Sequence, residues 1–144
     1  MPNFQINFKD ITSGFEYDKK ELKKIAKMIL SDAKIQSVVL NIVFVDDEFI
    51  IKMNKEYLKV DSATDVISFV LENDQEKGAL EGEVYADLEQ IQRQARQYKT
   101  GWINELFRVV IHGILHVVGY DDQSPPEQMA MTEKENHYLL LAKL

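Results

Sequence analysis

The chain contains no cysteine, which excludes disulfide bonds and thiolate metal sites. Any zinc site must therefore be built from imidazole and carboxylate groups. Histidine is also scarce, with three residues in a chain of 144. The lack of cysteine is compatible with a reducing compartment, and we expect the protein to be cytoplasmic.

Other sequence features that are rare or absent limit the possible architectures. With three prolines and six glycines, the sequence has no Pro/Gly-rich linker, and it shows no internal repeat or low-complexity tract. Its first residues lack the basic start and apolar core of a signal peptide, so none is expected. The longest apolar run, 106–120, is interrupted by an arginine and two histidines and is too short to span a membrane. We therefore predict one globular domain over residues 1–144.

Negative charge predominates and is unevenly distributed. The formal net charge is −7. Residues 1–59 have ten basic and nine acidic side chains, whereas residues 60–144 have seven and fifteen. This balance argues against loose, non-specific binding of nucleic acid, but it leaves room for a local basic patch that contacts phosphates.

Hydrophobic periodicity and capping residues predict strands that alternate with helices. Strands are expected at residues 4–8, 38–45, 66–71 and 83–86, with a loop or hairpin tip at 72–80. Helices are expected at residues 18–32, 46–57, 87–98, 102–118 and from 124 onward. The predicted fold class is α/β (α+β), with about four strands in a mostly mixed sheet covered by about five helices.

The most informative run is VVIHGILHVVGYDDQ, residues 109–123. His112 and His116 are one helical turn apart, so both imidazoles can converge on one ion. Gly119 is expected to end the helix, and the following turn can bring Asp122 back toward the same point. Two imidazoles and a carboxylate suit one Zn²⁺ and leave a position for water, whose pKa the ion lowers to about 7. The expected reactive group is therefore a metal-bound water.

Alternatives to a catalytic zinc site start from the same residues. Two histidines on an apolar helix could be hydrogen-bonded core residues, although an unpaired imidazole there would be costly. Gly113 in a helix interior indicates close approach by another segment or a substrate. It also stands where H-E-x-x-H metalloproteases have their glutamate base, so a peptidase is disfavoured and no general base is identified. Non-haem iron oxygenases use similar ligands, but from a β-barrel rather than a helix.

Residues 112–122, HGILHVVGYDD, resemble the H-G-x-L-H-L-x-G-Y-D-H signature of the YbeY family of rRNA maturation endoribonucleases. A second block agrees with that family: Asn54, Tyr57, Asp61 and then TDVISF at 64–69 resemble N-x-x-Y-R-x-x-D-x-P-T-D-V-L-S-F. The segment GEV at 82–84 is similar to the family's G-D-I, and QA at 94–95 to its Q-A.

The resemblance implies a metal-dependent hydrolase that cuts single-stranded RNA, with roles in 16S rRNA 3′-end maturation and ribosome quality control. It implies that His112, His116 and Asp122 are the metal ligands. The expected partners are single-stranded RNA, rRNA and the ribosome or its small subunit, with no membrane; no oligomeric state is implied. The alternative is a non-catalytic ribosome assembly or binding factor with a structural metal, which the acidic charge favours.

Two departures from the family pattern affect the site. Asp122 stands in place of a third histidine, which lowers the charge of the centre and makes Mn²⁺ or Fe²⁺ acceptable besides Zn²⁺. Leu58 replaces an arginine that is expected to contact phosphate. Lys59 and Arg108 are the candidates to supply that charge, with a salt bridge from Arg108 to Glu105 as the alternative.

Three further residues are candidates for substrate binding. Thr64, Asp65 and Ser68 belong to the second block and are expected to orient the substrate or the groups around the ligands. The alternative for Thr64 and Asp65 is a structural role at the end of a strand.

Overall fold

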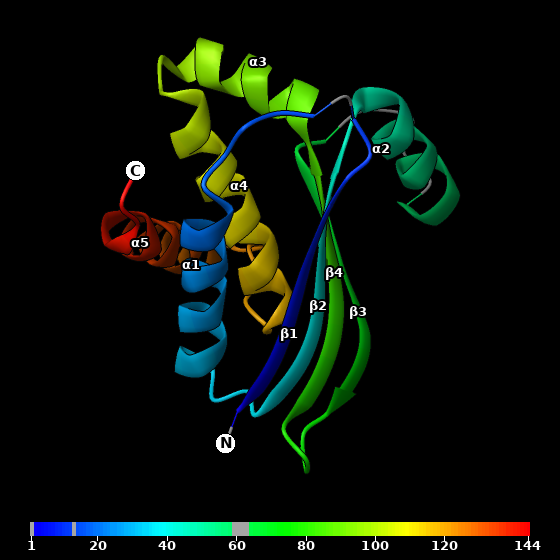
Figure 1. Ribbon diagram of the computed structural model, residues 1–144, viewed down its shortest axis with the longest axis vertical. Coiled ribbons are helices and arrows are strands. Elements are labelled where there is room, and N and C mark those ends of the chain that lie inside the picture. Colours follow the sequence, from blue (N-terminus) through cyan, green and yellow to red (C-terminus); the bar gives the residue numbers. More distant parts are fainter. Residues whose placement is uncertain (1, 13, 59–63) are drawn as a thin grey trace.

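The computed structural model describes residues 2–12, 14–58 and 64–144, and within them four strands and five α-helices (Figure 1). In chain order these are β1 (Asn3–Asp10), α1 (Lys19–Asp32), β2 (Ser37–Val45), α2 (Asp47–Met53), β3 (Val66–Asp74), β4 (Ala79–Asp87), α3 (Leu88–Tyr98), α4 (Trp102–Val117) and α5 (Pro125–Leu141). A π-helical turn, η1 (Asn54–Leu58), follows α2 directly. The expected fold class is confirmed.

The strands form one mixed sheet in the order β1-β2-β4-β3. β1, β2 and β4 are parallel, and β3 pairs antiparallel with β4 at the edge. The expected hairpin tip at 72–80 is present but shorter, because β3 runs to Asp74 and β4 begins at Ala79, which leaves residues 75–78 as the turn. Charged side chains there do not prevent pairing, since the strand backbones hydrogen-bond to each other while the residues of β3 from 70 to 73 remain exposed.

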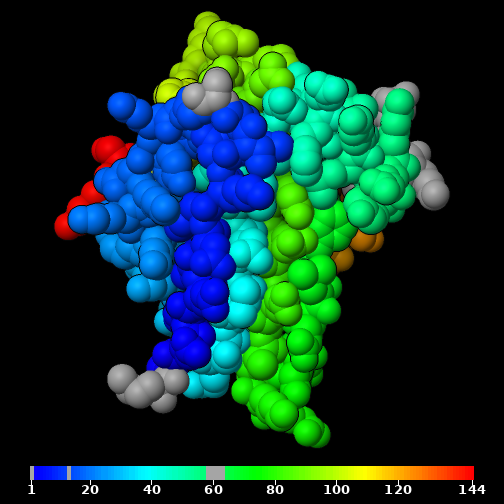
Figure 2. All heavy atoms as spheres, turned by 45° about the vertical axis from the view of Figure 1, so that its right-hand side comes forward, coloured from blue at the N-terminus to red at the C-terminus, as the bar shows by residue number. Residues whose placement is uncertain are grey.

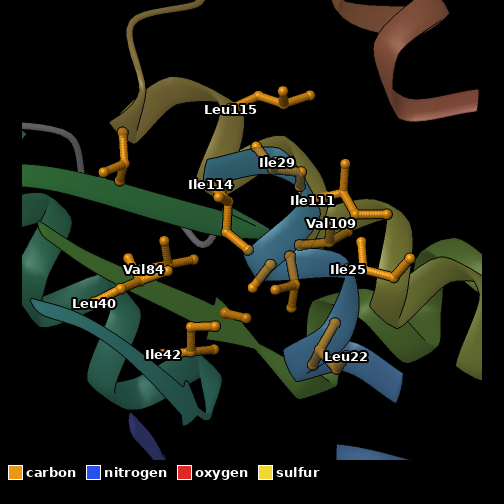
Figure 3. Packing of buried hydrophobic residues seen from close by; sticks show 14 of the residues in the cluster. Leu22, Ile25, Ile29, Leu40, Ile42, Val84, Val109, Ile111, Ile114 and Leu115 are labelled. Atoms are coloured by element: carbon orange, nitrogen blue, oxygen red, sulfur yellow. The ribbon is translucent and has the colours of Figure 1, made fainter. Parts of the chain in front are cut away.

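Helices α1 and α4 cover one face of the sheet and α5 packs on these two helices, while α2 lies on the other face near one end (Figure 1). Below α2, strand residues remain at the surface (Figure 2). The main core lies between α4, α1 and the sheet, where Ile114 and Ile111 of α4 join Ile25 of α1 and Leu40 and Val84 of the strands (Figure 3). Among the described residues, no helix combines the length and apolarity needed to cross a bilayer.

Helix α4 comes closest to the sheet at Gly113. A Cβ atom at this position would lie 2.6 Å from Cγ1 of Val84, 2.9 Å from Cγ2 of Val66 and 3.2 Å from Oγ of Ser68. The Ser68 hydroxyl donates a hydrogen bond to the Gly113 carbonyl at 2.8 Å. The expected close approach is thus made by strands β3 and β4. It determines the distance between the backbone of α4 and the sheet.

Replacing Gly113 by alanine should lower the free energy of unfolding by up to about 2 kcal/mol. Overpacking against Val84 and Val66 costs about 1–3 kcal/mol, and the higher helix propensity of alanine offsets about 1 kcal/mol of this. Urea unfolding measures the change. Gly101→Ala is the control, because a Cβ there meets nothing within 4 Å, and its cost should stay below about 1 kcal/mol. A Gly113→Ala protein more stable than the wild type by about 1 kcal/mol, the gain from helix propensity alone, would contradict the close packing.

Candidate metal centre

The C-terminal end of α4 turns the chain back as the sequence predicts. Gly119 has a φ of 112°, in the left-handed region that favours glycine. Its N–H donates to the His116 carbonyl at 3.1 Å, and the Tyr120 N–H donates to the Leu115 carbonyl at 3.0 Å. Helix α5 then begins with a capping box formed by Ser124 and Glu127. The loop between these two ends brings Asp122 beside α4.

The structure brings the three predicted ligands together. The Nε2 atoms of His112 and His116 are 3.0 Å apart. Oδ2 of Asp122 is 3.3 Å from Nε2 of His112 and 3.6 Å from Nε2 of His116. All three side chains are partly exposed, so the point on which they converge is open to solvent and to a ligand. This trio is hereafter called the ligand group.

The second ring nitrogen of each histidine, Nδ1, is also in a hydrogen bond. Nδ1 of His112 is 2.7 Å from Oε2 of Glu135, and Nδ1 of His116 is 3.0 Å from the Tyr120 carbonyl oxygen. Both partners accept hydrogen bonds, so in the neutral rings the proton is on Nδ1 and the Nε2 lone pair faces Asp122. Two lone pairs and a carboxylate aimed at one point are the donor set of a divalent cation, and they fit zinc without any thiolate.

The charges around His112 favour its protonated form when no cation is bound. Burial alone would lower the pKa of His112. The hydrogen bond and negative charge of Glu135, with the charges of Asp122 and Asp65, instead raise the pKa of the His112 imidazole above its ordinary value. The environment of this ring therefore stabilises positive charge.

The guanidinium of Arg108 is bound to helix α5, on the side of His112 where Glu135 lies. Its Nη1 donates to Oε1 of Glu135 at 3.1 Å, and its Nη2 donates to Oδ1 of Asn136 at 3.0 Å. Arg108 thus forms the salt bridge that was the alternative, but with Glu135 in place of Glu105, since buried Glu105 accepts from Nε2 of Gln94 at 3.1 Å. Sequence patterns did not single out Glu135, whose one local signal is that it is an acid on the buried side of α5.

A cleft of about 980 Å³ lies beside the ligand group along strand β3. Thr64 and Ser68 line it together with His116 and Asp122. Asp65 does not line this cleft: it accepts from Nε2 of Gln94 at 3.2 Å and borders a smaller cavity of about 210 Å³ next to His112. The predicted contact from Lys59 lies outside the described residues.

A second set of carboxylates, Asp47, Asp87 and Glu89, lies where α2 and α3 begin. Arg93 forms a forked ion pair with Asp47, at 2.8 Å to each oxygen, and lowers the pKa of Asp47 to about 2. Asp87 is fully buried, and no donor faces its Oδ2 atom. Burial and the neighbouring Asp47 raise the pKa of Asp87 to about 8. A proton on Asp87 that is donated to Asp47 explains both observations without a metal.

Comparison with known proteins gives consistent matches. A family model described as endoribonuclease YbeY matches residues 5–143. The protein described as endoribonuclease YbeY from Chloroherpeton thalassium is 37% identical over 124 residues, covering 86% of each chain. Its counterpart from Flavobacterium psychrophilum is 34% identical over 139 residues, covering 96% of this chain and 93% of its own.

One solved structure also resembles the chain over most of its length. The solution structure of TM1509 from Thermotoga maritima has a TM-score of 0.64 and 29% sequence identity. The match covers 94% of this chain and 87% of that one. The arrangement of the sheet and helices is therefore also found in a solved structure.

Replacing Asp87 by asparagine should make the free energy of unfolding depend less on pH. The raised pKa of Asp87, about 8 against a usual 3.8, means that the folded state binds more protons than the unfolded chain between about pH 4 and pH 8. Stability from this group therefore falls as the pH rises through that range. Asp47 acts in the opposite direction, and only below about pH 4. Asparagine keeps an acceptor for the Glu89 N–H and a donor for Asp47 at every pH.

Urea unfolding of both proteins between pH 5 and pH 8 tests the acid pair. The difference in unfolding free energy between Asp87→Asn and wild type should grow in favour of the variant as the pH rises. A constant difference over this range would show that Asp87 does not carry the proton.

Replacing Asp122 by alanine should remove a metal ligand and leave the fold intact. Elemental analysis after zinc loading should find about one ion per wild-type chain and much less in the variant, because two imidazoles alone hold zinc weakly. Asp121→Ala is the control, since it removes the same charge from the neighbouring exposed position. Equal zinc content in the two variants would contradict the ligand assignment.

Proposed function

Because the chain belongs to the YbeY endoribonuclease family, we propose that it is a metal-dependent endoribonuclease that cuts single-stranded RNA during rRNA processing. The observation that supports this most directly is the convergence of His112, His116 and Asp122 at the wall of the large cleft. We place its activity in the cytoplasm, in 16S rRNA 3′-end maturation and ribosome quality control. Its partner there is the ribosome or its small subunit.

The ligand group is the proposed holder of one metal ion. His112, His116 and Asp122 offer two nitrogens and one oxygen, which suits Zn²⁺, while the carboxylate also makes Mn²⁺ or Fe²⁺ acceptable. When bound, such an ion supplies a Lewis acid for the phosphodiester and a source of nucleophilic water near neutral pH. The three side chains are partly exposed, so a phosphate can reach the point that they share.

The cleft is the proposed path of the RNA strand. It follows β3, an edge strand, whose outer side presents backbone N–H and C=O groups that are not used by β4. Thr64 adds a hydroxyl to the same wall, whereas the Ser68 hydroxyl donates to Gly113 and so holds α4 in place. The net charge of −7 gives little non-specific attraction for RNA, so contacts within the cleft must supply the affinity.

A second candidate function is a non-catalytic ribosome assembly or binding factor with a structural metal. The leucine at position 58 favours it, because leucine cannot contact a phosphate as the family's arginine is expected to do. Arg108 does not replace that arginine in the cleft, since its guanidinium is held by Glu135 and Asn136. A role for Lys59 in guiding RNA stays a prediction.

Cleavage of a labelled single-stranded oligoribonucleotide separates the two functions. The zinc-loaded wild type should cut it, and His116→Ala should cut it at least about 100-fold more slowly, because the metal contributes several kcal/mol to the reaction. The control is His137→Ala, which removes an exposed histidine of α5 that is absent from the ligand group. Equal cleavage by wild type and His116→Ala, or none by either, would contradict the nuclease. Binding of ribosomal small subunits without cleavage would favour the assembly factor.

A further inference from the structure

Glu135 is a buried acid of α5 that contacts His112 of the ligand group at Nδ1, the ring nitrogen that does not face Asp122. Its side chain is 10% exposed. One carboxylate oxygen, Oε2, lies 2.7 Å from Nδ1 of His112, and the other, Oε1, lies 3.1 Å from Nη1 of Arg108. We propose that Glu135 is a positioning residue that fixes the tautomer and ring orientation of His112, and that Arg108 holds Glu135 for this task. The proposal rests on the proposed function, because it concerns the same metal centre.

The tautomer follows from the chemistry of the two groups. A carboxylate can only accept hydrogen bonds, so a neutral His112 ring must have its proton on Nδ1 to make this contact. The other nitrogen, Nε2, then has its lone pair free, and it is this atom that lies 3.3 Å from Asp122 and 3.0 Å from His116. Glu135 thus determines which nitrogen of His112 is available to a metal ion.

The two histidines of the ligand group have different partners at Nδ1. His116 donates to a neutral backbone carbonyl, that of Tyr120, whereas His112 donates to a carboxylate. A carboxylate partner makes the imidazole more basic and so a stronger ligand. His112 is therefore the ligand that depends on a side chain distant in sequence, 23 residues away, while His116 depends on its own helix end.

Arg108 has the geometry of a support for Glu135. It lies one helical turn before His112, so both side chains leave α4 on the same face. The forked guanidinium reaches Glu135 and the adjacent Asn136 of α5, which fixes the plane of the carboxylate. Burying a carboxylate is costly unless a positive partner and hydrogen bonds compensate its charge. The positive charge of Arg108 is thus used within the protein, outside the cleft that contains Thr64 and Ser68.

Zinc affinity is the first measurement that tests the proposal. Competition with a chromophoric chelator should show that Glu135→Ala binds Zn²⁺ about 10–100-fold more weakly than the wild type, the usual effect of losing such a partner. Glu135→Gln keeps one acceptor oxygen and should lose less. The matched control is Glu133→Ala, which removes an exposed acid from the same helix and should leave the affinity unchanged. Wild-type affinity in Glu135→Ala, or an equal loss in Glu133→Ala, would overturn the proposal.

The tautomer itself is the second measurement, and it needs neither metal nor RNA. Nitrogen-15 NMR of the metal-free protein, at a pH where the imidazoles are neutral, should show His112 protonated at Nδ1 in the wild type. Glu135→Ala should give a mixture of tautomers, with His116 unchanged, in a chain whose amide spectrum remains folded. If Glu135→Ala does not fold, Glu135→Gln provides the comparison and should show a partial shift toward the mixture. An unchanged His112 tautomer in the folded variant would overturn the proposal, whatever the outcome of the RNA cleavage assay.

Discussion

The close contact between α4 and the sheet at Gly113 is the constraint on which the rest of the site depends. With no side chain at that position, the helix backbone comes near enough to accept a hydrogen bond from Ser68 of β3. The residue before Gly113 and the residue three positions after it are the two histidines, so the same contact places them beside the edge of β3. The ligand group and the cleft therefore share a border because a helix and a strand are packed without a Cβ between them.

Polar side chains occupy few positions of this apolar helix, and those around the ligand group have partners. The histidines donate to Tyr120 and Glu135, and Glu135 is in turn paired with Arg108. Buried polar groups without partners destabilise a fold, so this pairing lets a functional group be built at the end of a core helix. Asp87 at the start of α3 follows the same rule, with a proton shared with Asp47 in place of a positive side chain of its own.

The parts of the site that could be predicted from the sequence are those encoded locally. His112, His116, Gly119 and Asp122 fall within eleven residues, and helical geometry with a glycine stop is enough to bring them together. Glu135 could not be predicted in this way, since its contact depends on how α5 crosses α4. The strands of the β3–β4 hairpin were predicted too short for a related reason: pairing between strands outweighs the polar composition of residues 72–80.

The reach of α5 back to His112 has a consequence for the order in which the centre is completed. A chain is synthesised from its N-terminus, so His112, His116 and Asp122 emerge before Glu135 does. Until the last helix has formed and docked, His112 has no acceptor for its Nδ1 proton, and either nitrogen can carry it. Maturation of the centre is therefore tied to the synthesis and docking of α5, and a nascent chain without this helix presents the ligands without the geometry that orders them.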